Sequence, residues 1–390
     1  MESEFRVEWD DGRRRQRLAA TRTGHDWVVL GSVRRAMLYV AYALIPVLLM
    51  AGLYWKWDVA PEQRRLAQTE PRIDQIYDAV DPADSTTAVV DLVGLGNVDA
   101  APTARTLTSF TDIGRVWSVT FDNRGIDTEV ISDLIAQRAR TAGVRNVVLV
   151  GHSMGGVVAL EVAQHIYEDT DRVLSGVVLD CTPVDLHAVR GDARDAGEDL
   201  LRWIGWLPGA RESRTLRAVV EMAARKDRFV DMHSAWYPSI DVDAAQEAFM
   251  QVMEDKILNP TAASNGFIES QFRTIVASGA LDNLDSLAGT VPGKPRPAMV
   301  FMRPAWAWAD NVVDVNYSQR VLFERVGGTD GTLTVVRMHG TGHANPRQAP
   351  AAYNSSVATR VLPVLEETIA RDLRSPLTLD PVFRAGVSSP

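Results

Sequence analysis

The chain has 390 residues, of which 46% are hydrophobic and 23% are charged, and it carries a net charge of −9. This composition suffices for one large domain with accessory segments, and an acidic chain without a long basic stripe is not expected to bind nucleic acid. The single cysteine, Cys181, excludes an intrachain disulfide framework and a thiolate metal cluster, and we expect it to pack in the core. The sequence predicts neither a cofactor nor a metal site.

The N-terminal part holds a basic tail, residues 1–35, followed by an apolar run without any charge, residues 36–55. Twenty such residues form a helix long enough to cross about 30 Å of hydrocarbon, and Pro46 is tolerated in a spanning helix. Tyr54, Trp55 and Trp57 lie at its end, at the position of an interfacial aromatic belt. The run therefore predicts one uncleaved transmembrane helix.

A buried core helix and a cleaved signal peptide are the alternatives for this run. A core helix seldom lacks charge over such a length. Arg34 and Arg35 resemble a twin-arginine start, but the run is too long for a signal peptide and no A-x-A-like cleavage site follows it.

Most basic residues near the helix lie upstream of it, which predicts a cytoplasmic N-terminus and a following domain outside the cytoplasm. They are Arg13, Arg14, Arg15, Arg17, Arg22, Arg34 and Arg35 upstream, and Lys56, Arg64, Arg65 and Arg72 downstream.

A polar connector follows at residues 56–86. Strand and helix patterns then alternate over residues 87–375, and residues 376–390 form a C-terminal tail. Such alternation implies an α/β fold, with a mostly parallel sheet and helices on both faces. Strands are predicted at residues 87–96, 115–125, 147–150, 173–180, 298–303 and 332–338, and helices at residues 128–140 and from near residues 157 and 316.

A long insertion, about residues 184–296, separates two of these strands and predicts a large helical cap over the carboxyl ends of the strands. Such a cap favours a bulky, apolar substrate. Trp203, Trp206 and Trp236 either line an acyl pocket under the cap or serve ordinary packing. The insertion includes residues 199–209, an amphipathic stretch at residues 211–226, and residues 248–253 and 267–276. The last of these places Ile268, Phe272, Ile275 and Val276 on one helical face.

The segment Gly151-His152-Ser153-Met154-Gly155-Gly156 lies between a β-branched run and a helix-like pattern. Its glycines allow a turn too tight for residues that carry a Cβ atom. G-x-S-x-G at a strand-to-helix turn is typical of a nucleophile elbow, which exposes the serine hydroxyl next to the first N–H groups of the helix. We therefore predict Ser153 to be a nucleophile rather than part of a plain turn.

A serine nucleophile needs a base, and the base needs an orienting acid. His343 and His339 follow the last predicted strand. Two loop glycines give the His343 ring room to reach the serine, whereas His339 is expected to pack at the strand end. Asp310 and Asp314 follow the preceding strand, and Asp314 suits a solvated or capping acid at the next helix, which favours Asp310.

With these residues the chain resembles the α/β-hydrolase superfamily, in particular its lipases and esterases, over about residues 87–374. The resemblance rests on residues 151–156, on Phe121-Asp122-Asn123-Arg124-Gly125, on Asp310 and on Gly340-Thr341-Gly342-His343. It implies that Ser153 is the nucleophile, that His343 is the general base and acid, and that Asp310 orients His343.

The resemblance also implies an oxyanion hole. Its donors would be the Met154 N–H and an N–H from the loop Val93-Gly94-Leu95-Gly96, which lacks the histidine common in the family. Leu95 is the matching donor, with Gly96 as the alternative. The family's first two strands have no counterpart before residue 87, so the sheet is expected to begin there.

Together these features predict a membrane-anchored serine hydrolase that cleaves carboxylic esters with lipid-like or other apolar acyl groups. Its partners would be an ester substrate and, through the N-terminal helix, a membrane. A thioesterase, amidase or peptidase on the same scaffold is the first alternative, because a serine triad does not determine the leaving group. A non-catalytic binding protein with a hydrolase fold is the second, and the presence of Ser153, Asp310 and His343 argues against it.

Overall fold

The computed structural model describes residues 11–22, 30–231, 239–259 and 261–374. Contacts divide the chain into two units, Met1–Pro61 and Glu62–Pro390. The first unit contains the helices α1 (Asp11–Ala19) and α3 (Leu30–Tyr54) and the π-helical turn η1 (Trp55–Val59), and α4 (Ala60–Leu66) leads into the second unit.

The stretch Gly31–Leu66 is continuously helical, and within the described part of the chain it is the one helix long and apolar enough to cross a membrane. None of the side chains in its most apolar 18-residue window is buried. A buried core helix, one of the alternatives from the sequence, would have shown the opposite. The predicted apolar run, residues 36–55, lies inside this stretch, and Pro46 lies within α3.

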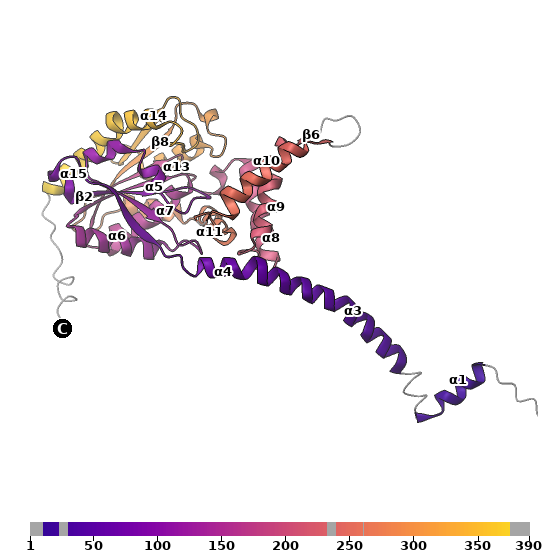
Figure 1. The fold of residues 1–390 in the computed structure, drawn as a ribbon. Coiled ribbons are helices and arrows are strands. Elements are labelled where there is room, and N and C mark those ends of the chain that lie inside the picture. The colour runs from indigo at the N-terminus through magenta and orange to yellow at the C-terminus, as the bar shows by residue number, and fades with distance from the viewer. Residues whose placement is uncertain (1–10, 23–29, 232–238, 260, 375–390) are drawn as a thin grey trace, which may run out of the picture. The chain divides into compact units, whose positions relative to one another are not determined.

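The second unit is built on a seven-stranded sheet in the order β1-β3-β2-β4-β5-β8-β9 (Figure 1). All neighbouring strands are parallel except β1, which pairs antiparallel with β3. The strands are β1 (Arg72–Tyr77), β2 (Thr87–Leu92), β3 (Arg115–Thr120), β4 (Asn146–His152), β5 (Val173–Asp180), β8 (Ala298–Pro304) and β9 (Leu333–Met338).

The expectation that the sheet begins at residue 87 was wrong, because β1 adds an edge strand from within the predicted connector. The sequence of β1, RIDQIY, mixes charged and apolar residues, and among its six residues only Ile73 is buried. An edge strand with one face in solvent carries a weaker apolar pattern than a central parallel strand, which explains why sequence reasoning missed it.

Helices cover both faces of the sheet, as predicted. One face packs against α6 (Thr128–Ala142), α7 (Met154–Asp169), α12 (Ala280–Ala288) and α13 (Val315–Val326). The other packs against α5 (Ala101–Ala104), η3 (Thr108–Asp112), α14 (Pro350–Ser356), η8 (Val357–Val361) and α15 (Leu362–Arg374). Figure 1 shows α14 and α15 above the sheet and α6 below it.

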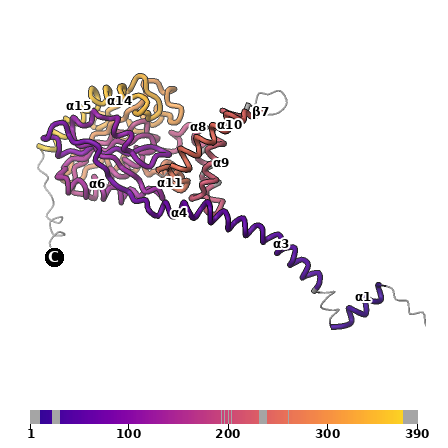
Figure 2. The backbone as a smooth tube through the Cα atoms, in the orientation of Figure 1, coloured from indigo at the N-terminus to yellow at the C-terminus, as the bar shows by residue number. Residues whose placement is uncertain are grey.

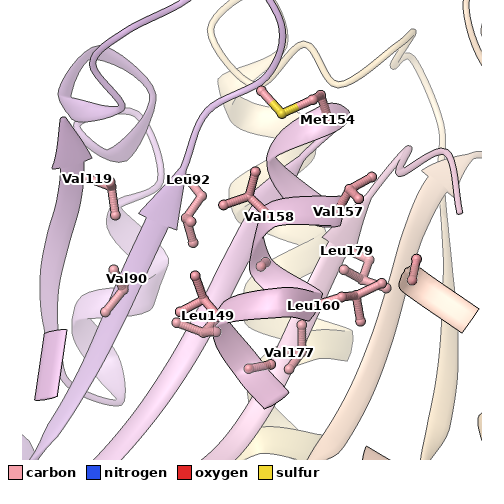
Figure 3. Packing of buried hydrophobic residues seen from close by; sticks show 14 of the residues in the cluster. Val90, Leu92, Val119, Leu149, Met154, Val157, Val158, Leu160, Val177 and Leu179 are labelled. Carbon is pink, nitrogen blue, oxygen red and sulfur yellow. The ribbon is translucent and has the colours of Figure 1, made fainter. Parts of the chain in front are cut away.

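The central strands are apolar because both of their faces are covered. Every residue of β2, β4, β5 and β8 is buried. Figure 3 shows Val157, Val158 and Leu160 of α7 packed over Leu149, Val177 and Leu179 of the strands below. Helix α7 is thereby held firmly against the middle of the sheet, at the point where β4 ends.

The predicted insertion contains a helical cap, whose helices Figure 2 shows grouped at one side of the domain, away from α15. Its helices are α8 (Gly191–Trp206), α9 (Arg214–Ala224), α10 (Val242–Val252) and α11 (Asn265–Val276), and an unpredicted short pair, β6 (Val230–Asp231) and β7 (Ser239–Ile240), lies between α9 and α10. Helix α11 packs on α7 and α8, whereas α12, also in the insertion, packs on α7 and α13 as part of the covering layer.

Candidate active site

Ser153 occupies the sharp turn between β4 and α7. Its backbone angles are φ 54° and ψ −123°, a conformation that residues with a Cβ atom rarely adopt and that costs about 1–3 kcal/mol. Its N–H donates a hydrogen bond to the Asp180 carbonyl oxygen at 2.8 Å. A Cβ atom at Gly155 would lie 2.4 Å from the Leu92 carbonyl oxygen, and one at Gly156 would overlap the Thr182 side chain. Only glycines at these positions let α7 start this close to β2 and β5.

The structure brings Ser153, His343 and Asp310 together although 190 residues separate the serine from the histidine in sequence. The Ser153 Oγ atom lies 2.8 Å from His343 Nε2, and His343 Nδ1 lies 2.9 Å from Asp310 Oδ2. Both contacts are within hydrogen-bonding distance. The arrangement has the geometry required for a hydroxyl nucleophile, a base and an acid that orients the base.

Asp310 is fully buried and follows the 3₁₀ turn η7 (Ala307–Ala309). Its second oxygen, Oδ1, accepts hydrogen bonds from the Val312 and Val313 N–H groups at 2.9 and 2.8 Å. Burial acts to raise the pKa of this carboxyl group, but His343 and the two N–H donors outweigh it and hold the pKa below its usual range. Asp314 instead caps α13 by accepting from the Asn316 and Tyr317 N–H groups.

The loop after β2 lies against the elbow. A Cβ atom at Gly94 would come within 2.9 Å of the His152 carbonyl oxygen and 3.2 Å of the Ser153 Cβ atom. The Leu95 N–H has no hydrogen-bond acceptor among the described residues, whereas the Gly96 N–H donates to Gln271. Met154 is the first residue of α7, where backbone N–H groups lack a partner within the helix. Leu95 and Met154 thus remain available as donors, and Gly96 does not.

A cavity of about 660 Å³ opens above Ser153 and His343. Its wall is mostly apolar, and the cap contributes Phe272 and Ile275 from α11. The other apolar wall residues include Val93, Leu95, Pro183, Val189, Val312 and Val313, and the polar ones include Asn97, Thr103, Asn345, Arg347 and Gln348. The volume is within the range of small-molecule sites.

A second polar cluster, which sequence reasoning missed, lies buried beneath the elbow. His152 Nδ1 is 2.8 Å from Asp180 Oδ2 at the end of β5, and His152 Nε2 is 3.0 Å from Asp91 Oδ1 in β2. Burial acts to lower the pKa of His152, but the charge of Asp91 and the hydrogen bond to Asp180 raise it to about 10. His152 thus contacts an acid on each of the two strands that neighbour β4, and its raised pKa favours the protonated ring.

The cluster extends to the loop that carries His343. The Tyr353 hydroxyl donates to Asp180 Oδ1 at 3.3 Å and accepts from the Asn345 N–H at 3.0 Å. Burial and the charge of Asp180 raise the pKa of Tyr353, so the hydroxyl keeps its proton. The sequence does contain a signal for this cluster, because Asp91 and Asp180 each lie in a largely apolar strand. That both strands neighbour β4 becomes known only with the strand order.

Several other predictions have definite outcomes. Cys181 is buried, as expected. His339 is exposed, so the expectation that it packs at the strand end was wrong. Trp206 is 80% exposed and neither lines the cavity nor packs. Val276 is also exposed and does not share the buried face of α11. The Trp203 side chain and the whole of Trp236 lie outside the described residues.

Cys181, Asp310 and His343 are the one group of potential metal ligands found among the described residues, with ligand atoms within 4.8 Å of one another. Both ring nitrogens of His343 already have partners, so a metal ion would have to break the contacts to Ser153 or Asp310. Burial also raises the pKa of Cys181, which favours the thiol over the metal-binding thiolate. These three side chains therefore suit the hydrogen bonds from Ser153 through His343 to Asp310 better than they suit a metal ion.

Residues 47–356 match the sequence model of the alpha/beta hydrolase family. The chain belongs to the α/β-hydrolase family. The seven-stranded sheet, the elbow and the order of the three strand-end residues agree with this assignment. No curated protein sequence matches the chain.

Several solved structures are similar to this hydrolase. A membrane phospholipase A described as a bacterial virulence factor is 18% identical, with 87% of this chain and 98% of that chain covered and a TM-score of 0.47. An esterase from Exiguobacterium antarcticum is 16% identical, with 76% and 96% covered and a TM-score of 0.45. A monoacylglycerol lipase from Paleococcus ferrophilus is 14% identical, with 77% and 99% covered and a TM-score of 0.45. These names describe those proteins, and the family assignment rests on the sequence match.

The raised pKa of His152 predicts how stability depends on pH. Because its pKa in the folded protein, about 10, exceeds its usual value of 6.5, its stabilisation is fully present below pH 6.5 and is lost as the pH rises through 10. We expect the free energy of unfolding of the wild type to fall relative to His152→Gln by up to about 1.4 kcal/mol per pH unit in this window.

Urea unfolding of the full chain in detergent, measured at intervals from pH 6 to pH 10, checks this difference. His339→Gln is the matched control, because His339 is exposed after β9 and this variant should follow the wild-type curve. Parallel curves for the wild type and His152→Gln would contradict the buried imidazolium.

Proposed function

We propose that this chain is a membrane-anchored serine hydrolase that cleaves carboxylic esters with apolar, lipid-like acyl groups. The observation that carries the proposal is the contact of Ser153 with His343, and of His343 with buried Asp310, at the base of a mostly apolar cavity. The apolar part of the wall, which includes Phe272 and Ile275 of the cap, accommodates an acyl chain.

In the proposed reaction, Ser153 Oγ attacks the ester carbonyl carbon while His343 Nε2 takes the hydroxyl proton. Asp310 accepts the His343 Nδ1–H hydrogen bond and, with its lowered pKa, stays ionised at neutral pH, so it stabilises the imidazolium that forms. The N–H groups of Leu95 and Met154 hold the developing oxyanion, and each such donor is worth roughly 3 kcal/mol in the transition state.

Collapse of the tetrahedral intermediate breaks the bond to the leaving alkoxide, which takes the proton from His343 and departs as an alcohol. The acyl group remains on Ser153. Water then attacks the acyl carbonyl as His343 takes one of its protons, and the carboxylic acid leaves as the Ser153 hydroxyl regains its proton. Each step uses the same pair of N–H donors.

Hydrolysis of p-nitrophenyl esters from acetyl to palmitoyl by the full chain in detergent micelles tests this proposal. We expect Ser153→Ala to abolish turnover and Asp310→Asn to lower kcat by about 10⁴-fold, because the histidine then loses its orienting carboxylate. Asp314→Asn is the matched control, since asparagine still caps α13 and activity should stay within about twofold. Undiminished activity of Ser153→Ala, or faster cleavage of matched thioesters or amides than of esters, would contradict the proposal.

We also propose that the apolar helix anchors the hydrolase, with the N-terminal tail in the cytoplasm and the sheet domain outside. The helix within Gly31–Leu66 has sufficient length and mean hydropathy, and the upstream excess of arginine supports this orientation. Cys181 is buried, so an introduced cysteine can be labelled against a low background.

Cysteine labelling of intact cells tests this orientation. A membrane-impermeant maleimide should modify Glu324→Cys, on the exposed surface of α13, without lysis, and Gln16→Cys, in α1, only after lysis. Neither substitution removes a basic residue that sets orientation. Labelling of Gln16→Cys but not of Glu324→Cys in intact cells would show the opposite topology. Release of the chain from membranes by an alkaline carbonate wash would contradict the anchor itself.

A further inference from the structure

A side chain of cap helix α11 holds the loop that carries Leu95. Gln271 lies on α11 and is fully buried. Its Oε1 atom accepts the Gly96 N–H at 2.8 Å, and its Nε2 atom donates to the Asn97 carbonyl oxygen at 3.2 Å. One amide group therefore contacts two successive residues of the loop, although no sequence pattern marks Gln271.

These contacts act on a tight turn. The Asn97 N–H donates to the Gly94 carbonyl oxygen at 3.3 Å, and Gly96 has φ 81°, as the third residue of a type II turn requires. A type II turn converts to type I when the peptide between its second and third residues rotates by about 180°. Here that is the Leu95–Gly96 peptide, and Gln271 accepts its N–H.

Gln271 thereby occupies one loop donor, the Gly96 N–H. The Leu95 N–H, for which no acceptor is found among the described residues, stays free beside the cavity. An oxyanion donor works only within about 2.7–3.1 Å of the developing charge, and a displacement of about 1 Å can lower the rate by 10²-fold. In such a rotation the Gly96 N–H and the Leu95 carbonyl oxygen reverse direction while φ of Leu95 stays at about −60°. Loss of both hydrogen bonds from Gln271 would free Gly96 and Asn97, so the loop that carries the Leu95 N–H would no longer be held at one distance from Ser153.

We propose that Gln271 is a positioning residue for the oxyanion hole, so that cap helix α11 is required for transition-state stabilisation as well as for covering the cavity. The inference rests on the proposed ester hydrolysis. The same helix contributes Phe272 and Ile275 to the cavity wall, so the groups that would contact an acyl chain and the group that holds the loop move as one body. A cap displaced from the sheet would leave Ser153 and His343 in place but release the loop.

Two variants of the full chain in detergent test this role. Gln271→Met keeps the length of the side chain but removes both hydrogen bonds, and Gln271→Glu keeps an acceptor for the Gly96 N–H but turns an oxygen toward the Asn97 carbonyl. The matched control is Ser270→Ala. Ser270 Oγ accepts the Ile126 N–H at 3.0 Å, so this change removes a contact between α11 and the core that does not reach the loop after β2.

For p-nitrophenyl acetate we expect Gln271→Met to lower kcat by about tenfold or more with KM within about twofold, because the interaction is needed only in the transition state. Gln271→Glu should retain more activity than Gln271→Met, and Ser270→Ala should keep the wild-type kcat. The inhibition constant of a trifluoromethyl ketone, whose adduct with Ser153 carries an oxyanion, should rise by the same factor as kcat/KM falls. Binding of the carboxylate product should not change.

The inference would be overturned if Gln271→Met kept a kcat within twofold of the wild type, or if it raised KM with kcat unchanged. Ser153-dependent hydrolysis by the wild type would still support the proposed function in that case. An equal loss in Ser270→Ala would also overturn it, since the effect would then come from general loosening of the cap. If the wild type shows no Ser153-dependent hydrolysis, the proposed function fails and this inference fails with it.

Discussion

The rest of the site depends on the strained backbone of Ser153. A serine at φ 54° persists only where its surroundings leave no alternative, and here the Asp180 carbonyl oxygen holds its N–H while α7 packs over β4 and β5. Gly155 and Gly156 make this possible because any side chain there would strike β2 or Thr182. The turn exposes the hydroxyl and places the N-terminus of α7 beside it, so one local constraint supplies both the nucleophile and one oxyanion donor.

The buried polar groups connect the loops that must act together. His152 joins β4 to Asp91 of β2 and Asp180 of β5, and Tyr353 joins Asp180 to Asn345, two residues after His343. The elbow, strand β2, the end of β5 and the histidine loop therefore share one network beneath the cavity. The cap is bonded to the sheet domain as well. Asn123, after β3, accepts the Ser264 N–H at 2.7 Å and donates to the Ala262 carbonyl oxygen, and Gln271 of α11 holds the loop after β2. The cap and the sheet domain thus meet through buried hydrogen bonds, and those of Gln271 reach the loop that lines the cavity.

Much of this was predictable from the sequence where the signal is local. The strand at residues 173–180 was predicted with the bounds it has, because a continuous apolar run between turns is the pattern of a strand buried on both faces. Ser153, Asp310 and His343 each follow a strand, and parallel strands bring such residues to one edge, where the structure places them. Edge strand β1 was missed because half of its residues are polar. The His152 network and Gln271 were missed because their partners become neighbours only when strand order and cap docking are known.

The most direct test of the account is covalent labelling of the full chain with a fluorophosphonate, followed by mass spectrometry of its peptides. The account predicts one adduct, on Ser153, that is absent in Ser153→Ala and forms far more slowly in His343→Ala, because the hydroxyl is a poor nucleophile until its base removes the proton. An adduct on another serine, or labelling of Ser153 at the same rate without His343, would contradict the assignment of Ser153 and His343 as nucleophile and base.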